Sequence, residues 1–279
     1  MAKDNRSRFN LWFQPGDAAA RNGSGHHRAL AAAAGIASAL AAVAAPASAH
    51  DPEPVASAPI VLPTAPDLGP GFERVPPYFG RTFGGLTAQW WQWAMSIPAG
   101  VNPLADESGE HCDVNQEGRV WFLAGTTGGA VTRACTIPPG KAVLFPIFNV
   151  VCTTATEDGE TKEELRRVCT DIVDAVTELE AAVDGEVVVG SRAEGAAHRV
   201  QSPPFSLVFT ADNVFGVESP DPNPSPAVAE GFWVLLAPLS LGEHVIEFRA
   251  VADFTDLGGD LFTTEVEYRI AVEQAGGAG

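Results

Sequence analysis

The last third of the chain has the clearest alternation of largely apolar and polar residues. Two alternating stretches lie between Glu243 and Val272, separated by the glycine-containing segment 253–260. Successive side chains of a strand point to opposite faces, so this pattern predicts two strands with one buried face each. The inward series are His244, Ile246, Phe248 and Ala250, then Phe262, Thr264, Val266, Tyr268, Ile270 and Val272. Such strands are typical of an antiparallel sheet that covers a core.

Shorter apolar runs predict further strands that are covered on both faces. These runs span residues 120–124, 142–148 and 232–236. Pro146 has no N–H group for a ladder hydrogen bond, so we expect an edge strand or a bulge there. Residues 179–183 alternate as a half-buried strand does and precede Asp184-Gly185, which predicts a tight hairpin into residues 186–189.

Two segments have apolar residues at helical spacing. Residues 86–96 form the first, with a tryptophan-containing stripe that Pro98 ends, and Trp91 lies off this stripe. Thr161 starts a capping box of the S/T-x-x-E type, and an apolar stripe continues over residues 165–176. We therefore expect one helix before the strands and a second helix within them.

Together these patterns predict a mainly β fold, an antiparallel β-sandwich with one or two short helices, of which a jelly roll is one form. We expect a single sandwich domain over residues 80–273. The preceding residues 50–79 are rich in proline, which favours a disordered, extended spacer, and we expect residues 274–279 to form a flexible tail.

The first 49 residues have the pattern of an export signal. A basic start is followed by an alanine-rich apolar run and by Pro46-Ala47-Ser48-Ala49, which resembles an A-x-A cleavage site. An uncleaved signal anchor is the alternative interpretation, because the apolar run is of marginal spanning length. Either reading predicts a secreted, periplasmic or cell-surface protein, with no membrane span if the leader is removed.

Charge narrows the range of partners. The chain has 17 basic and 35 acidic residues, and removal of the leader leaves 12 and 33, a net charge of −21. Such an acidic chain repels nucleic acid and anionic membrane surfaces, so we expect neither as a partner. An extracellular glycan or another cell-surface component remains as a partner class.

The four cysteines are expected to form disulfides. Three pairings of four cysteines are formally possible, and we favour Cys112–Cys135 and Cys152–Cys169. The second pairing would join the end of the strand that starts at residue 142 to the buried face of the second helix. A zinc site is the alternative, but the C-x2-C spacing that such sites favour is absent.

Few residues suggest catalysis. The chain lacks a G-x-S-x-G elbow, an H-E-x-x-H helix, a Walker loop and a dinucleotide fingerprint. The weak catalytic candidates are Glu107, Glu110 and His111, because carboxylates beside an imidazole can perform acid–base chemistry or hold a metal. A solvated acidic loop held by a disulfide is the simpler interpretation.

Two weak binding candidates remain. Asp253, Asp256 and Asp260 offer hard oxygen ligands on a flexible loop, which suits Ca²⁺, although the spacing is not that of an EF-hand. Among the tryptophans Trp91 is the best candidate for stacking on a ligand, since the others fit a core. No further cofactor is expected.

Several motifs together resemble those of a group of uncharacterised exported bacterial proteins. They are Trp90-Trp91-Gln92-Trp93, Ser96-Ile97-Pro98, Asn102-Pro103, Val120-Trp121-Phe122-Leu123-Ala124-Gly125, Arg133-Ala134-Cys135, Pro139-Gly140-Lys141 and Phe145-Pro146-Ile147. The resemblance spans about residues 80–272. It implies a secreted, disulfide-containing, β-rich domain and carries no catalytic residue with it.

The function that these observations favour is a non-catalytic binding or surface-structural module. One alternative is an extracellular carbohydrate-active hydrolase or lyase that uses the 106–111 loop. Another is a Ca²⁺-dependent adhesive domain that uses the 253–260 loop.

Overall fold

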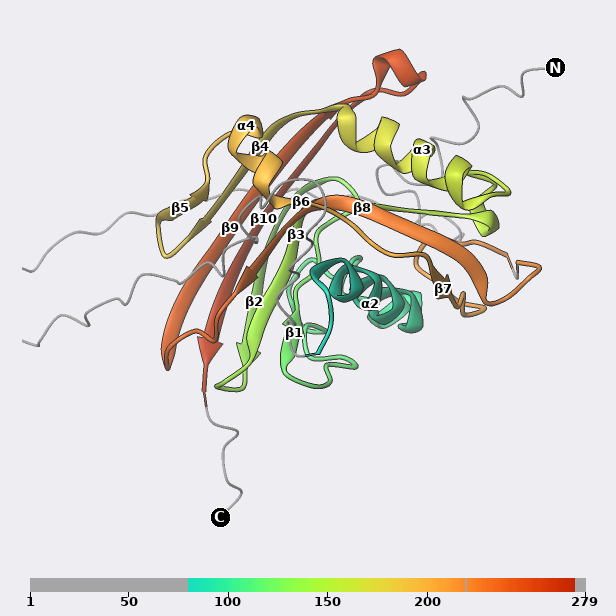
Figure 1. Ribbon diagram of the computed structural model, residues 1–279. Helices are drawn as coiled ribbons and strands as arrows, with labels where there is room; N and C mark the ends of the chain where they lie inside the picture. The colour runs from blue at the N-terminus through green and yellow to red at the C-terminus, as the bar shows by residue number, and fades with distance from the viewer. Residues whose placement is uncertain (1–79, 219, 274–279) are drawn as a thin grey trace, which may run out of the picture. The chain divides into compact units, whose positions relative to one another are not determined.

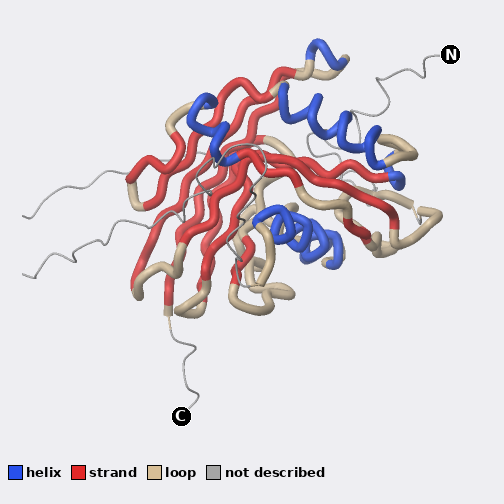
Figure 2. Tube along the Cα trace, in the orientation of Figure 1, coloured by secondary structure: helices blue, strands red, loops and turns tan. Residues whose placement is uncertain are grey.

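The structure is a computed structural model that describes residues 80–218 and 220–273. These residues form two five-stranded sheets packed face to face, with short helices against the first sheet (Figures 1 and 2). The first sheet has the order β1-β3-β8-β6, and β7 also pairs with β8. The second sheet has the order β2-β10-β9-β4-β5. The predicted mainly β, sandwich-like class is confirmed.

The strands are β1 (Val120–Phe122), β2 (Gly129–Ile137), β3 (Ala142–Thr153), β4 (Val176–Val183), β5 (Glu186–Val189), β6 (Arg199–Gln201), β7 (Phe205–Leu207), β8 (Ser225–Leu236), β9 (Gly242–Asp253) and β10 (Leu261–Val272). The helices are α2 (Phe83–Ser96), α3 (Lys162–Asp174) and α4 (Arg192–Gly195), with 3-10 turns η1 (Ala99–Val101), η2 (Thr154–Thr156), η3 (Ala196–His198) and η4 (Thr255–Leu257).

The core between the sheets contains the alternating residues of β9 and β10. Ile246, Phe248, Val266 and Tyr268 are almost fully buried and pack against the inner face of β3. Phe145 of β3 stacks on Phe248 with ring centroids 5.1 Å apart. The outward residues of β9 and β10 are mostly charged, which explains the sequence alternation.

Helix α2 covers the other face of the first sheet. Thr82 caps it, since its hydroxyl accepts a hydrogen bond from the Gly85 N–H at 2.9 Å. Trp90 is fully buried against Trp233 of β8, and its Nε1 donates to the Leu123 carbonyl at 2.9 Å. Figure 1 shows α2 and α3 on opposite sides of the strand β8. The sheet is thus covered on both faces, as its continuous apolar runs predict.

A bulge in β3 changes which side chains face the helix α2. The pairing of β3 with β8 shifts between Pro146 and Phe148, close to the irregularity expected at Pro146. Before the shift Phe145 faces the core between the sheets, whereas after it Phe148 and Val150 do so. One inserted residue reverses the alternation, so Asn149 shares a face with Val151, which packs on the α2 side.

Both predicted disulfides are present, Cys112–Cys135 and Cys152–Cys169. The second joins β3 to α3, and the Cα atoms of its cysteines are 5.8 Å apart. The capping box of α3 is also formed, with Thr161 as N-cap and Glu164 as its reciprocal partner. The disulfide therefore fixes this helix against the first sheet.

Other expectations need correction. The sheets are mixed rather than antiparallel, because β1 runs parallel to β3 and β2 runs parallel to β10. The first helix begins at Phe83, three residues before the expected start, because Thr82 supplies an N-cap. Strands β2, β6 and β7 were not predicted at all. The leader, the spacer and the tail lie outside the described residues, within which no helix is long and apolar enough to cross a membrane.

Candidate functional site

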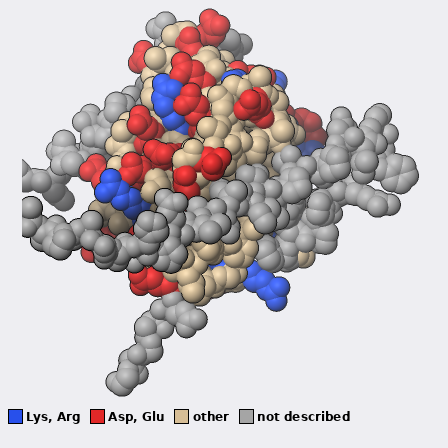
Figure 3. Space-filling view, turned by 90° about the vertical axis from the view of Figure 1, so that its left-hand side faces the viewer, with Lys and Arg blue, Asp and Glu red and all other residues tan. Residues whose placement is uncertain are grey.

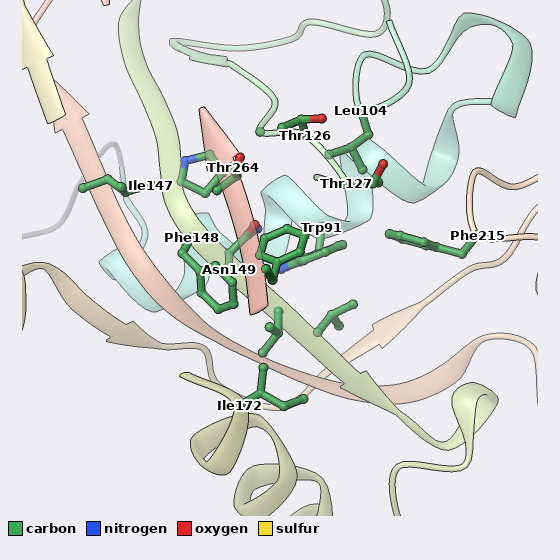
Figure 4. Close-up of a pocket in the computed structure, with 15 residues that line it drawn as sticks. Trp91, Leu104, Thr126, Thr127, Ile147, Phe148, Asn149, Ile172, Phe215 and Thr264 are labelled. Carbon is green, nitrogen blue, oxygen red and sulfur yellow. The ribbon is translucent and has the colours of Figure 1, made fainter. Parts of the chain in front are cut away.

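A cavity lies beside the edge of β3 that does not pair with β8. Its volume is about 50 Å³. The residues that line it come from both faces of β3 and from the surrounding loops, and they are Trp91, Leu104, Gly125, Thr126, Thr127, Pro146, Ile147, Phe148, Asn149, Val150, Val151, Ile172, Phe215, Phe262 and Thr264. Figure 4 shows Thr126 and Thr127 on one side of the cavity and Ile172 on the other. Because the lining includes both faces of β3, the edge of this strand itself borders the cavity.

The lining is aromatic and aliphatic apart from a few uncharged polar groups. Trp91, Phe148, Phe215 and Phe262 contribute rings, and no charged side chain lines the cavity. Trp91, the sequence candidate for ligand stacking, is 3% exposed and borders the cavity from α2. An apolar cavity with a few convergent polar groups is the usual form of a small-molecule site.

Two of these polar groups are buried without a hydrogen-bond partner. They are the Nδ2 atom of Asn149 and the Oγ1 atom of Thr264. Thr264 as a whole residue is 4% exposed. Asn149 is directed to this side by the bulge in β3, and Thr264 comes from β10 in the other sheet. A buried polar group without a partner costs about 1–3 kcal/mol, so the cavity offers two unused hydrogen-bonding groups to a ligand.

The loop between β1 and β2 forms one wall of the cavity and is held by a buried arginine. Arg133 is 1% exposed, and its Nη1 donates to the carbonyls of Ala124 at 2.9 Å and Gly125 at 2.8 Å. The same atom donates to the Tyr268 hydroxyl at 2.9 Å, and this hydroxyl donates to the Ala124 carbonyl at 3.0 Å. Burial raises the pKa of Tyr268, which keeps its hydroxyl protonated. These bonds fix the loop beside the edge of β3 that does not pair with β8.

The predicted acid–base residues do not converge on this cavity. Glu107 and Glu110 are exposed, and Glu110 instead borders a shallow hollow of about 380 Å³ beside the disulfide Cys112–Cys135. His111 is half-buried, and its backbone N–H donates to the carboxylate of Asp106 at 2.8 Å. The structure brings together no catalytic arrangement of the three side chains, and Asp106 is the residue that organises the loop.

The carboxylate of Asp106 accepts several hydrogen bonds within this loop. Burial opposes its ionisation, but bonds from the backbone of His111, from the backbone and hydroxyl of Ser108, and from the backbone of Gly109 lower its pKa. A group with a depressed folded pKa stabilises the fold above its unfolded pKa, and this stabilisation is lost as the pH falls through the folded value.

We therefore expect Asp106→Ala to lower the free energy of unfolding by about 1–2 kcal/mol at pH 7. The difference from the unmodified protein should shrink as the pH falls below about 4, which is the ordinary range of an aspartate pKa. Urea unfolding at pH 7 and pH 3 measures this. A difference that is constant between the two pH values would contradict a role for the ionised carboxylate.

The predicted calcium loop is an open turn around η4. The side chain of Asp253 accepts hydrogen bonds from the Thr255 N–H at 3.0 Å and from its hydroxyl at 2.7 Å, and these bonds lower the pKa of Asp253. Asp256 and Asp260 are exposed. Within residues 80–218 and 220–273 no three His, Cys, Asp or Glu side chains are grouped for a metal ion.

A serine, a histidine and an aspartate also contact one another at the beginning of β9. His244 Nδ1 is 2.7 Å from Asp184 Oδ2, and His244 Nε2 is 3.3 Å from Ser240 Oγ. However, the carbonyl oxygen of Ser240 is closer to Nε2, at 3.0 Å, and so competes with the hydroxyl for this nitrogen. None of the three residues lines a cavity described above. The cluster fixes the Asp184 turn to β9, as expected for a hydrogen-bonded structural histidine.

The outer face of the second sheet has a wide, shallow groove of about 570 Å³. Its side chains include Glu180, Glu247, Glu265 and Arg249, and Arg249 is paired with Glu178 at 2.6 Å. Figure 3 shows acidic groups gathered on the side of the molecule that it faces. Solvated charges are the ordinary state of a sheet face that is turned to solvent, so the groove is a weaker candidate than the cavity at β3.

Comparisons with known protein families, with curated proteins and with solved structures found no significant match.

Proposed function

We propose that this protein is an exported, non-catalytic binding module whose site is the cavity beside β3. The ligand group that enters is small and apolar and has a hydrogen-bond acceptor, such as a carbonyl oxygen. The observation that carries this proposal is the pair of buried, unpartnered groups on Asn149 and Thr264 within an otherwise apolar lining. The two disulfides fit an oxidising compartment, and the leader in residues 1–49 is the proposed export signal.

The size of the cavity limits the ligand. A cavity of about 150 Å³ holds benzene, so one of about 50 Å³ accepts a group of only a few heavy atoms. A whole sugar ring does not fit, which disfavours the glycan-degrading alternative at this site. The rest of a larger ligand would lie outside the cavity against Phe215 and Leu104.

A matched pair of small probes tests this proposal. We expect acetone to shift the NMR signals of the Asn149 side-chain amide and of the Thr264 methyl group at millimolar concentration. Propane has the same three carbons without the acceptor and should bind at least about tenfold more weakly, because one hydrogen bond to an otherwise unsatisfied group is worth about 1–2 kcal/mol. Equal binding of the two probes, or binding of neither, would contradict the proposal.

The variant Thr264→Val gives a second test, because it should raise the stability of the protein and weaken its preference for a ligand with a hydrogen-bond acceptor. Replacement of the unpartnered hydroxyl by a methyl group of similar shape should raise the melting temperature by about 2–4 °C, which corresponds to about 1 kcal/mol. The same change should reduce the preference for acetone over propane. Thr263→Val is the matched control, since this neighbour points to the outer face and should change neither quantity. A loss of stability in Thr264→Val would mean that the hydroxyl serves the fold rather than a ligand.

A further inference from the structure

The two unpartnered groups of the cavity determine what kind of chemical group they can receive. Asn149 Nδ2 is an amide nitrogen and can only donate a hydrogen bond, whereas Thr264 Oγ1 can donate or accept one. The entering group must therefore present an acceptor to Asn149. A carbonyl oxygen has two lone pairs, so a single oxygen is enough for both protein groups.

The remaining lining excludes a charged group and favours an apolar one beside the acceptor. The chain has 35 acidic and 17 basic residues, yet none of those that the structure describes lines the cavity. A carboxylate or an ammonium group would lose its hydration here without a counter-ion, so neither is expected to enter. The rings of Phe148 and Phe262 and the side chain of Ile147 offer apolar contacts instead. The entering group therefore combines one acceptor oxygen with a small hydrocarbon part.

We infer that this group is an acetyl group, carried by a sugar that stays outside the cavity. This inference rests on the proposed function and names the class of ligand for the same cavity. An acetyl group consists of one carbonyl and one methyl group and has one heavy atom fewer than acetone, so it suits a volume of about 50 Å³. Its methyl group would contact Phe148 and Phe262, and its oxygen would accept a hydrogen bond from Asn149 Nδ2.

The entrance of the cavity favours a sugar as the carrier. Thr126, Thr127 and Phe215 are half-buried members of the lining, so a ligand enters past them. Figure 4 shows Phe215 beyond Trp91, and the ring centroids of these two residues are 6.3 Å apart. An acetyl group of a sugar is attached close to the ring, so the ring would lie at this entrance. Its apolar face would pack on Phe215, and its hydroxyl groups would lie near the two threonines.

A series of methyl glycosides titrated into the full chain tests this inference. The N-acetylglucosamine glycoside and an O-acetylated glucoside carry the group, and the plain glucoside is the matched control. At least one acetylated glycoside should shift the NMR signals of the Asn149 side-chain amide and the Thr264 methyl group, and it should bind at least about tenfold more tightly than the control. The N-butanoyl glycoside has two additional methylene groups, which a cavity of about 50 Å³ does not hold, so it should bind at least about tenfold more weakly than the N-acetyl glycoside.

The variant Phe215→Ala separates the carrier from the acetyl group. Loss of this ring should weaken binding of the acetylated glycoside at least about threefold more than binding of acetone, because acetone does not extend beyond the cavity. Val208→Ala is the matched control, since Val208 lies on the same segment between β7 and β8, is 51% exposed and does not line the cavity. If Phe215→Ala fails to fold, the comparison of the acetyl and butanoyl glycosides still decides, because it needs no variant.

The outcomes distinguish this inference from the proposed function. Binding of acetone without binding of either acetylated glycoside would overturn the inference and leave the proposed function intact. Binding of none of the three would overturn both. Equal binding of the acetyl and butanoyl glycosides would show that the acetyl group does not enter the cavity and would also overturn the inference. Tighter binding of Nε-acetyl-lysine amide than of both glycosides would overturn the sugar as the carrier and identify a peptide instead.

Discussion

Replacing Arg199 by methionine is expected to lower the free energy of unfolding by about 3–5 kcal/mol. Arg199 lies on β6 and pairs with Glu230 of β8, with 2.6 Å between Nη2 and Oε1. The side chain of Glu230 is 0% exposed, so loss of the arginine would leave a buried carboxylate without its counter-ion. Breaking a buried ion pair from one side is strongly destabilising for this reason.

The surrounding bonds show why the pair forms despite the cost of burial. Glu230 also accepts hydrogen bonds from Thr170 at 2.8 Å and from Gln201 at 3.0 Å. Burial lowers the pKa of Arg199, but its bonds to Asp174 and Glu230 outweigh this effect and raise the pKa. The network joins α3, β6 and β8 at the side of the first sheet away from β1.

Urea unfolding at neutral pH measures the effect of Arg199→Met. Arg167→Met is the matched control, because Arg167 pairs with Asp171 on the exposed face of α3 and should change stability by less than about 0.5 kcal/mol. The double variant Arg199→Met with Glu230→Leu should recover at least half of the loss, since apolar residues of similar size can replace a buried pair. A single variant as stable as the control would contradict the assignment of Glu230 as the buried partner of Arg199.

The sequence predicted those elements in which local pattern and tertiary environment agree. The strands β9 and β10 are twelve residues long and each has one mainly buried face. The turn between β4 and β5 is predicted by its Asp184-Gly185 pair alone. The capping box at Thr161 is equally local. In each case the residues that define the element lie within a few positions of one another, so the local sequence is sufficient to predict the element.

Strand β2 was missed because its buried face does not look apolar. Its buried residues are Arg133, Cys135 and Ile137, so a charged residue occupies the first of these three positions. A buried arginine that bonds to loop carbonyls resembles a surface residue in sequence. The parallel partner of β2 is β10, more than a hundred residues away, and no local pattern indicates which strands will meet.

The candidate site was predicted only in part. Trp91 was selected because it lies off the helical stripe, but the structure buries it beside the cavity rather than exposing it on a surface. Asn149 has a signal that could have been used, since it is the one polar residue in the apolar run from Ala142 to Val151. Its direction depends on the bulge after Pro146, and Thr264 comes from the other sheet, so their convergence required the fold.

Arg133→Met is expected to have a similarly large effect on stability and a specific effect on the cavity. The variant removes the donors for the carbonyls of Asp106, Ala124 and Gly125 and for the Tyr268 hydroxyl. Several buried acceptors would lose their partners together, so the free energy of unfolding should fall by about 3–5 kcal/mol. Arg269→Met on the neighbouring strand is the control, because its side chain is 68% exposed and bonds to Glu267 on the outer face of the sheet.

The effect of Arg133→Met should reach the ligand through the loop that this arginine holds. Without it, we expect the amides of Gly125 and Thr126 to exchange at least tenfold faster under conditions in which the variant remains folded. Binding of acetone should weaken at the same time, because this loop forms one wall of the cavity. Arg199→Met acts at the other side of the sheet, so its folded fraction should bind the probe normally. If both variants weakened binding equally, the loss would follow from lower stability alone, and the role of Arg133 in shaping the cavity would be contradicted.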